Sequence, residues 1–247
     1  MNEVAIVTGA GSGIGRAVAL RLAESGKTVI LFGRDRQALQ ETTDSGKGDF
    51  IIVQGDVTNE KDIAELMKTA EAAGGVNVLV NNAAVMPIAP IDTAELPDWK
   101  ATVDTNLMGM LNVTHAVMQG MRARGSGHLV MISSVAGRHP FPAAAVYSAT
   151  KAAMDSFSEG LRAECAAAMK HGGPSIRVTT IAPGAVSTNL TASIRDIETR
   201  SHTEAYYASM TSPLTPEDVA DAVQFVIETP PHVCISDITM RPTEMVR

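Results

Sequence analysis

The sequence predicts a doubly wound α/β fold, in which a parallel sheet is covered by helices on both faces. Short, nearly continuous apolar runs recur along the 247 residues, and runs without strict alternation are typical of strands buried on both faces. Segments with helical spacing separate these runs, and no internal repeat, low-complexity tract or linker divides the chain. Strand and helix therefore alternate within a single predicted domain, residues 1–247.

The apolar runs and the segments between them define the expected elements. The first helical segment places Ile14, Val18 and Leu22 on one face. A long helix is expected from Trp99 to Met121. The predicted strands are Val4–Val7, Thr28–Phe32, Phe50–Val53, Val76–Val80, His128–Ile132, Ile176–Ile181 and Val233–Met240.

The last predicted helix has the clearest boundaries. Thr215 is its expected N-cap and Pro216 its first helical residue, and Pro230-Pro231 stops it. Residues 185–213 before it are rich in Ser, Thr and charged residues and lack a long apolar stripe. Since long insertions of this kind usually have a functional reason, we expect either a surface excursion or a substrate lid.

Composition narrows the classes of partner. Apolar residues make up 45% of the chain and aromatic residues 4%, so the core must be aliphatic. The net charge of −7 without a basic cluster argues against nucleic-acid and anionic-membrane partners. No apolar run approaches the roughly 20 residues of a membrane span, and we expect a cytoplasmic protein. Cys165 and Cys234 predict neither a disulfide framework nor a metal site.

A glycine-rich turn follows the first predicted strand. Residues Thr8-Gly9-Ala10-Gly11-Ser12-Gly13-Ile14-Gly15 lead directly into a helical pattern. Glycines there permit a tight turn and let the backbone approach a pyrophosphate, and a helix N-terminus offers free N–H groups to the anion. The spacing is Gly-x-x-x-Gly-x-Gly, so the position of the turn, more than its spacing, predicts a dinucleotide site.

The end of the second strand bears on which dinucleotide is used. An NAD site is expected to have an acid about 20 residues beyond the turn. Gly33 stands there, and Arg34 follows it. An arginine can hold a 2′-phosphate through paired, charge-assisted hydrogen bonds, which favours NADPH over NAD. The alternative is that Arg34 is merely solvated and Asp35 takes the place of the acid.

Tyr147 and Lys151 lie four residues apart in a helical run, so they are neighbours on one helix face. A free tyrosine has a pKa of about 10, too high for an efficient base near neutrality. A cation about 4 Å away contributes roughly 4 kcal/mol at an effective dielectric of about 20. The pair therefore predicts an acid/base tyrosine whose pKa is lowered to about 7.

Two further polar residues are expected near this pair. The strand His128–Ile132 ends in Ser133-Ser134, at the edge where ligands bind such sheets. A serine hydroxyl there could polarise a carbonyl. Asn106 lies within the apolar stripe of the Trp99–Met121 helix, and a buried helical Asn must find partners. It is either a satisfied core residue or part of a polar relay.

These motifs together resemble the short-chain dehydrogenase/reductase family, across essentially all of the chain. The 13-residue gap from Ser134 to Tyr147 is the usual one in that family and selects Ser134 over Ser133. The resemblance implies a Rossmann-type sheet of seven parallel strands and assembly as a homotetramer or homodimer. The matching pieces are Thr8–Gly15, Asp56-Val57, Asn81-Asn82-Ala83, Asn106, Ser134, Tyr147 with Lys151, and Pro183-Gly184.

The resemblance also implies a role for each catalytic residue. Tyr147 would be the general acid/base, and Ser134 would hold the substrate oxygen. Lys151 would lower the pKa of the tyrosine and hold the nicotinamide ribose, while Asn106 would hold a water in a proton relay to Lys151. The implied cofactor-binding residues are Gly9, Ser12, Gly13, Ile14, Gly15, Arg34, Asp56, Val57, Asn82, Ala83, Tyr147, Lys151, Pro183, Gly184, Val186 and Thr188.

Within that set the resemblance distributes the contacts. Asp56 and Val57 would contact the adenine, and residues 81–83 would border the cofactor. The segment after Pro183-Gly184 would cover the nicotinamide, which explains the expected lid. Two residues depart from the family pattern: Ala84 replaces a usual glycine, and Ser12 stands where many NADPH-dependent members carry a basic residue.

Residues 214–219 and 241–243 are similar to a narrower branch with NADP-dependent 3-hydroxy acid dehydrogenases and clavulanic acid dehydrogenase. The leading hypothesis is an NADPH-dependent oxidoreductase that reduces a ketone or aldehyde reversibly. The alternative, oxidation of a 3-hydroxy acid or hydroxy amino acid, would need a cation for the carboxylate, and Arg138, Arg195 and Arg200 are candidates. A third hypothesis is a catalytically silent dinucleotide sensor.

The expected substrate pocket carries few charges, which favours a neutral or largely apolar ketone. Besides residues 185–213, it draws on Met86, Val135, Ala136, His139, Phe141 and Val146.

Overall fold

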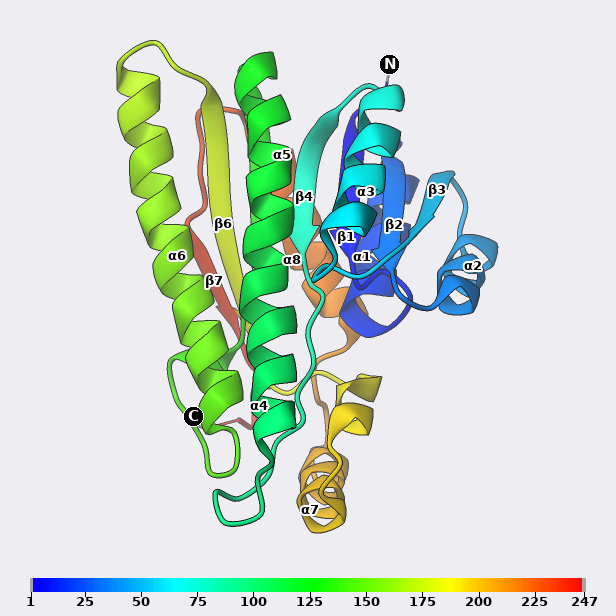
Figure 1. Ribbon diagram of the computed structural model, residues 1–247, viewed down its shortest axis with the longest axis vertical. Helices are drawn as coiled ribbons and strands as arrows, with labels where there is room; N and C mark the ends of the chain where they lie inside the picture. The colour runs from blue at the N-terminus through cyan, green and yellow to red at the C-terminus, as the bar shows by residue number, and fades with distance from the viewer. Residues whose placement is uncertain (1, 246–247) are drawn as a thin grey trace.

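A computed structural model describes residues 2–245, whose strands form one seven-stranded sheet (Figure 1). The strand order is β3-β2-β1-β4-β5-β6-β7, and every neighbouring pair is parallel. The predicted doubly wound α/β fold with seven parallel strands is therefore confirmed. The strands are β1 (Val4–Thr8), β2 (Thr28–Gly33), β3 (Asp49–Gln54), β4 (Val76–Asn81), β5 (Ser126–Ile132), β6 (Ser175–Pro183) and β7 (Asp237–Met240).

Helices cover both faces of the sheet (Figure 1). One face carries α1 (Gly13–Glu24), α2 (Arg36–Ser45) and α8 (Pro216–Glu228). The other carries α3 (Glu60–Ala72), α4 (Leu96–Val103), α5 (Met110–Arg124) and α6 (Ala145–Lys170). Both faces need a cover because successive side chains of a strand point to opposite sides. In β1, Ala5 and Val7 belong to one buried cluster and Val4 and Ile6 to the other.

The strand order places the functional edge of the sheet. The chain runs from β1 outward to β3 and then returns to β4 on the other side of β1. Ligands of such sheets bind at the carboxyl ends of the strands, where the order reverses. The carboxyl ends of β1 and β4 meet at this point, and the turns that follow them carry the glycine-rich segment and Asn82.

Capping fixes the helix that precedes β7. Thr215 is the N-cap of α8, and its hydroxyl accepts from the Asp218 backbone N–H at 3.2 Å. The Asp218 carboxylate accepts in return from the Thr215 N–H at 2.7 Å. Pro216 occupies the first turn, where its missing N–H costs no hydrogen bond. The start predicted for this helix is confirmed.

Two predicted elements differ from the structure. The Trp99–Met121 helix is divided, because a π-helical turn, η1 (Asp104–Gly109), separates α4 from α5. Such turns insert an extra residue into a helix and often occur at functional sites. The last strand begins at Asp237, so residues 233–236 of its predicted range lie outside it.

Residues 185–213 contain two helical pieces. These are a 3-10 turn, η3 (Asn189–Ser193), and α7 (Ile197–Ala208). Figure 1 shows α7 beyond the carboxyl ends of the strands, outside both helix layers. The segment is tied to the body by a bridge between Val186 and Leu214.

Candidate active site

A cleft of about 1390 Å³ runs along the carboxyl edge of the sheet. Its lining comes from the turns after β1 to β6 and from η3 and α7. Of the predicted site residues, Gly15 and Asn106 lie outside this lining and are buried. The others line it: Gly9, Ser12, Gly13, Ile14, Arg34, Asp56, Val57, Asn82, Ala83, Ser134, Tyr147, Lys151, Pro183, Gly184, Val186 and Thr188.

The turn after β1 needs its glycines for different reasons. Gly9 and Gly13 have φ values of 66° and 51°, which side chains other than glycine rarely adopt. Gly15 has an ordinary backbone, but a Cβ there would lie 2.2 Å from the carbonyl oxygen of Gly9. The turn therefore packs directly on the first turn of α1, and a larger residue at position 15 would push the two apart.

This turn presents hydrogen-bond donors to the cleft. Ser12 is the N-cap of α1, yet its side chain makes no capping hydrogen bond. Arg16 braces the turn from behind, donating to the Gly11 carbonyl at 2.7 Å and to the Thr42 hydroxyl at 3.1 Å. A helix N-terminus with a free serine hydroxyl and no acidic residue in its first turn suits an anion. The turn therefore fits the pyrophosphate of a dinucleotide.

The end of β4 is locked to the end of β1. The Thr8 hydroxyl accepts from the backbone N–H groups of Asn82 and Ala83 at 2.9 and 3.0 Å, and the Asn82 amide donates to the Thr8 carbonyl at 2.9 Å. Asn81 does not border the cleft as predicted. Its buried amide donates to Thr114, behind the sheet edge. Asn81 is the last residue of β4 and its side chain points to α5, whereas Asn82 stands in the turn beyond the strand, where it lines the cleft.

Arg34 and Asp35 have different surroundings at the end of β2. The Arg34 side chain is 68% exposed, lines the cleft and lies 3.9 Å from Asp56. Asp35 is the N-cap of α2, and its Oδ1 accepts from the N–H groups of Gln37 and Ala38. Its carboxylate is thus committed to the helix, which weakens the alternative that Asp35 binds a ribose. Val57 and Asp56 line the same end of the cleft.

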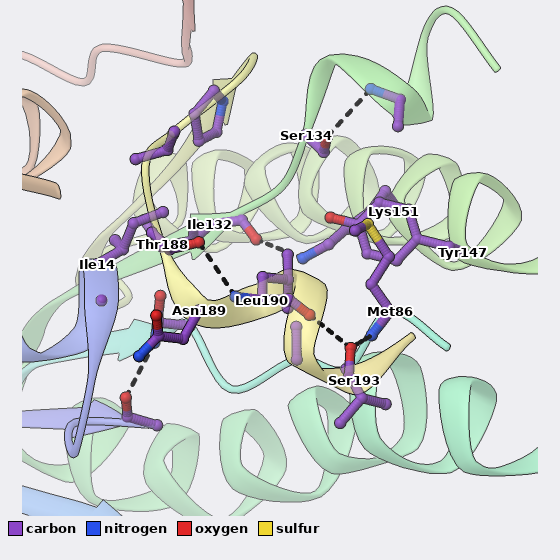
Figure 2. A pocket seen from close by; sticks show the side chains of 18 of the residues that line it. Ile14, Met86, Ile132, Ser134, Tyr147, Lys151, Thr188, Asn189, Leu190 and Ser193 are labelled. Atoms are coloured by element: carbon purple, nitrogen blue, oxygen red, sulfur yellow. Dashed lines mark hydrogen bonds between the residues drawn. The ribbon is translucent and has the colours of Figure 1, made fainter. Parts of the chain in front are cut away.

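Ser134 is held by the 3-10 turn η2 (Val135–Gly137) that follows it. Its hydroxyl oxygen accepts from the Ala136 N–H at 3.1 Å (Figure 2). A serine hydroxyl has one proton to donate and two acceptor lone pairs. The turn occupies one lone pair, so the proton can be donated to groups in the cleft: the Tyr147 oxygen, whose pKa this hydroxyl lowers, or a carbonyl oxygen.

Tyr147 and Lys151 lie in the buried face of α6, as their spacing predicts. The Lys151 ammonium donates to the Ile132 carbonyl at 2.8 Å and lies 5.9 Å from the centre of the Tyr147 ring. Burial lowers the pKa of Lys151 to about 8, while Asp155 acts in the opposite direction. The Lys151 ammonium therefore points toward β5. It lowers the pKa of Tyr147 less than the four-residue spacing predicts.

The expected lowering of the Tyr147 pKa to about 7 is wrong for this structure. Burial raises the pKa of Tyr147 above its ordinary value; the Ser134 hydroxyl lowers it, and Tyr207 raises it further. The physical reason is that removing the phenolate from water costs more than the nearby groups return. Tyr147 is therefore a neutral phenol near neutrality, which makes it a proton donor.

Asn106 binds the loop after β4. Its Oδ1 accepts from the Val85 N–H at 2.8 Å, and its Nδ2 donates to the Val85 carbonyl at 2.9 Å. A third contact of 3.4 Å reaches the hydroxyl of Thr150, the residue before Lys151. Its position in the π-helical turn aims the amide at this loop. The relay to Lys151 remains a prediction.

The β6 side closes the cleft near the glycine turn. Pro183, Gly184, Val186 and Thr188 all line it. Thr188 faces Gly13, where an added Cβ would lie 3.2 Å from the Thr188 methyl. η3 is joined to the opposite loop by Ser193, whose hydroxyl accepts from the Met86 N–H at 2.9 Å and donates to the Leu190 carbonyl at 2.7 Å (Figure 2).

Several cleft residues of η3 and α7 are not among those predicted individually from the sequence. Thr199, His202, Thr203 and Tyr206 line the cleft and recur at helical spacing, and Tyr207 lines it beside them. This polar and aromatic face explains why residues 185–213 lack an apolar stripe. The usable signal was that spacing of hydroxyl and aromatic side chains, which an apolar-periodicity search passes over.

The predicted substrate pocket is largely assembled. Met86, Val135, Ala136, His139 and Phe141 line the cleft, whereas Val146 does not.

The three candidate cations for a substrate carboxylate are engaged elsewhere. Arg138 binds Asp155 and Asp237, and Arg195 binds Asp98 at 2.9 Å. Arg200 donates to the backbone carbonyls of Ile194 and Ala192. These contacts weaken their candidacy for a substrate carboxylate, although Arg138 lines the cleft.

Among residues 2–245, every helix is too short or too polar to span a bilayer. Nor does this range gather three or more His, Cys, Asp or Glu side chains in a way that would hold a metal ion.

Known proteins match this chain over almost its full length. The family model described as short chain dehydrogenase matches residues 3–199. An uncharacterized oxidoreductase of Staphylococcus aureus (strain N315) is 37% identical over 243 residues, covering 98% of this chain and 97% of the relative. An uncharacterized oxidoreductase of Listeria monocytogenes is 37% identical over 246 residues, with coverages of 98% and 97%.

Two solved structures of serine dehydrogenase are also similar. The closed form complexed with NADP⁺ has a TM-score of 0.89 and 35% identity, covering 99% of this chain and 96% of that chain. The enzyme from Escherichia coli has a TM-score of 0.82 and 34% identity, with coverages of 99% and 100%. This chain belongs to the short chain dehydrogenase family, and it is an oxidoreductase of the NAD(P)-dependent dehydrogenase/reductase type.

Proposed function

We propose that this protein uses NADPH to reduce a ketone or aldehyde to an alcohol, reversibly. The observation that carries the proposal is the convergence of Ser134, Tyr147 and Lys151 on one cleft, with Tyr147 a neutral proton donor. Arg34 supports the choice of NADPH, because it is exposed at the cleft while Asp35 caps α2. The similar serine dehydrogenase complexed with NADP⁺ supports the same choice.

The dinucleotide, when bound, supplies the hydride. Ser134 donates its free O–H to the carbonyl oxygen and thereby fixes and polarises it. Tyr147 gives its phenolic proton to the same oxygen as the carbonyl is reduced. The tyrosinate left behind is stabilised by Lys151, whose pKa of about 8 leaves most of it charged near neutrality. Asn106 fixes the backbone of Val85, which lines the cleft, through two hydrogen bonds.

The cofactor is tested by comparing initial rates with NADPH and NADH. Arg34→Ala should lose preference for NADPH by about ten- to a hundredfold, since a charge-assisted hydrogen bond contributes roughly 1.5–3 kcal/mol. Arg36→Ala is the matched control, because Arg36 is an exposed arginine of α2 outside the cleft lining. A clear NADH preference of the wild-type protein contradicts the assignment.

The substrate we propose is neutral and partly apolar. Around Tyr147 the cleft offers Met86, Val135, Phe141 and the hydroxyl-bearing face of α7. The three arginines considered for a carboxylate are engaged in ion pairs or with backbone carbonyls. A panel of ketones, 3-oxoesters and hydroxy acids, followed by NADPH absorbance, tests this class. Turnover of ketones and 3-oxoesters well above that of hydroxy acids is expected.

The second candidate is a dehydrogenase of a 3-hydroxy acid or hydroxy amino acid. The similarity to serine dehydrogenases favours it. Besides Arg34, Arg138 and Lys151, the cleft is lined by His139 and His202, whose ring nitrogens could donate to a carboxylate. NADP⁺-dependent oxidation of serine or 3-hydroxybutyrate that exceeds ketone reduction in the same panel selects this candidate. Absence of any turnover in the panel is the result expected for a silent sensor.

We also propose a lid, a domain organisation, a location and an assembly for this protein. We propose that residues 185–213 act as the substrate lid, that the whole chain forms a single domain, and that the protein is cytoplasmic. We also propose a homotetramer or homodimer, which light scattering after size exclusion measures directly.

A further inference from the structure

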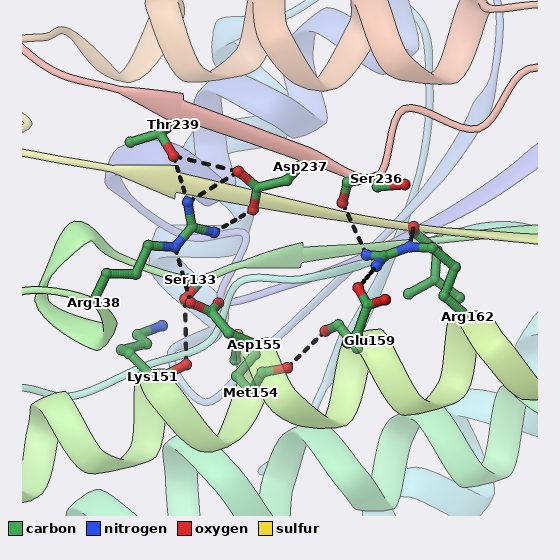
Figure 3. Close-up of polar contacts among 12 residues, drawn as sticks. Ser133, Arg138, Lys151, Met154, Asp155, Glu159, Arg162, Ser236, Asp237 and Thr239 are labelled. Atoms are coloured by element: carbon green, nitrogen blue, oxygen red, sulfur yellow. Dashed lines mark hydrogen bonds and ion pairs between the residues drawn. The ribbon is translucent and has the colours of Figure 1, made fainter.

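Arg138 lies at the end of η2, four residues after Ser134. It binds residues from two other elements (Figure 3). Its Nε lies 3.2 Å from Asp155 Oδ2 on α6. Its other nitrogens contact Asp237 and Thr239 on β7, with Nη1 donating to Asp237 Oδ1 at 2.9 Å. One guanidinium therefore joins the turn that carries Ser134 to α6 and to the edge strand.

The contact with α6 falls beside Lys151. Asp155 is four residues beyond Lys151, hence on the same helix face. Gly137 of η2 approaches α6 so closely that a Cβ there would lie 2.9 Å from the backbone of Lys151 and Ala152. The backbone contact and the Arg138–Asp155 ion pair thus clamp η2 onto the helical turn that presents Lys151.

Charged and polar groups from several elements surround Lys151. On α6 these are the Tyr147 phenol and the Asp155 carboxylate. Arg138, at the end of η2, forms ion pairs with both Asp155 and Asp237 of β7. β5 contributes a carbonyl, that of Ile132. Asp155 Oδ1 is buried without a hydrogen-bond partner within residues 2–245. Arg138 is therefore the cation in contact with the Asp155 carboxylate, whereas Asp155 acts on Lys151 through its charge alone.

We propose that Arg138 and Asp155 are positioning residues of the active site, which hold the Ser134 turn against α6 and set the charge environment of Lys151. The inference rests on the proposed role of Lys151 in the reaction. Asp155 favours the charged form of Lys151, and Arg138 limits that influence by pairing with the same carboxylate.

The pair predicts opposite effects of two substitutions on Lys151. Asp155→Asn removes the anion and should lower the pKa of Lys151 by about 0.5 unit or more, and Arg138→Gln leaves the carboxylate unbalanced and should raise it by a similar amount. The pKa is measured by NMR titration of protein carrying ¹³C-labelled lysine. Lys151 titrates near 8, well apart from ordinary lysines near 10.4, and Lys151→Met assigns its signal.

Glu159 and Arg162 provide the matched controls. Arg162 pairs with Glu159 on α6 and donates to the carbonyl of Ser236, the residue just before β7, at 2.9 Å (Figure 3). Glu159 and Arg162 lie eight and eleven residues beyond Lys151 on the same helix, at least two turns away from it. Glu159→Gln and Arg162→Gln should therefore leave the Lys151 pKa unchanged.

A purely structural role gives a different result. Loosening the site admits water, which raises a pKa that burial had lowered, so both Asp155→Asn and Arg138→Gln would then move it upward. An unchanged or raised pKa in Asp155→Asn overturns the proposal. Thermal melts by circular dichroism check that each variant is folded. Arg138→Lys keeps the positive charge, so its Lys151 pKa should lie close to that of the wild-type protein.

The same variants are then assayed with NADPH and ethyl acetoacetate. A fall in kcat of roughly ten- to a hundredfold with little change in KM for NADPH is expected for Arg138→Gln. The pH at which kcat is half-maximal should move with the measured Lys151 pKa. If the NMR shifts appear but no carbonyl is reduced, the proposed function fails while the Arg138–Asp155 inference stands. If reduction occurs and the shifts do not, the inference fails alone.

Discussion

Two helices that line the cleft, α6 and α7, are held to the molecule in different ways. α6 buries a continuous face that includes Tyr147 and Lys151, and its Asp155 forms an ion pair with Arg138, which in turn binds Asp237 of β7. No residue of α7 is fully buried, although Tyr207 is partly covered, and Ile197 at its start is 84% exposed. Proton transfer needs fixed distances, and the groups proposed to move a proton lie on the well-packed helix α6. The groups proposed to contact the substrate lie on α7, which packs less tightly.

The sharpest test of the fixed side is Tyr147→Phe. Only the proton donor is removed, so turnover should fall by about 10²- to 10⁴-fold, while NADPH affinity, measured by its fluorescence, should stay nearly constant. Turnover close to that of the wild-type protein contradicts the mechanism.

The stability of the sheet beneath α6 should depend on pH, because His128 of β5 is buried there. His128 on β5 lies 2.8 Å from the Thr179 hydroxyl, which itself donates to the Ile235 carbonyl and so accepts from the imidazole. Burial, followed by the charge of Arg177, lowers the pKa of His128 from 6.5 to about 3. Over that interval the unfolded chain binds a proton that the folded chain does not, so stability falls as pH falls.

The expected slope from this group is about 1.4 kcal/mol of unfolding free energy per pH unit. His128→Gln keeps a donor for Thr179 but does not titrate, and its stability should depend less on pH between 7 and 5. Urea unfolding at several pH values measures both proteins. Equal slopes would show that His128 is not buried in its neutral form.

On the loosely held side, Ser193→Ala should have the next largest effect. It removes the hydroxyl that joins η3 to Met86, and leaving a backbone N–H without its partner costs roughly 1–3 kcal/mol. KM for the carbonyl substrate should rise about tenfold, with kcat changed much less. Ser209→Ala is the control, because Ser209 makes the same kind of bond to a carbonyl three residues earlier, outside the cleft.

Tyr207→Phe should have the smallest effect. Tyr207 lines the cleft, and the pKa of its phenol is raised by burial and by the adjacent Tyr206. A lost neutral hydrogen bond to substrate corresponds to about 1 kcal/mol, or roughly a fivefold rise in KM. Steady-state kinetics on several carbonyl substrates measure it. A fall in kcat at constant KM would place Tyr207 with the chemical groups of α6 instead.

Much of the fold could be read from the sequence because its requirements are local. Continuous apolar runs identified all seven strands, and Thr215 with Pro216 identified the start of α8. Gly9, Gly13 and Gly15 could be singled out because a backbone conformation or a close approach excludes any other residue there. The π-helical turn at Asn106 was missed, since one inserted residue scarcely alters an apolar pattern.

Spacing and residue type were enough to predict that Ser134, Tyr147 and Lys151 meet at the carboxyl edge of the sheet. The protonation and the partners of these side chains depend on how the whole chain packs. Burial sets the direction of the Tyr147 pKa, and Arg138 is committed to a carboxylate 99 positions away in the chain. The physical reason is that spacing along a helix or strand is a local property, whereas desolvation and ion pairing depend on every element packed around a group.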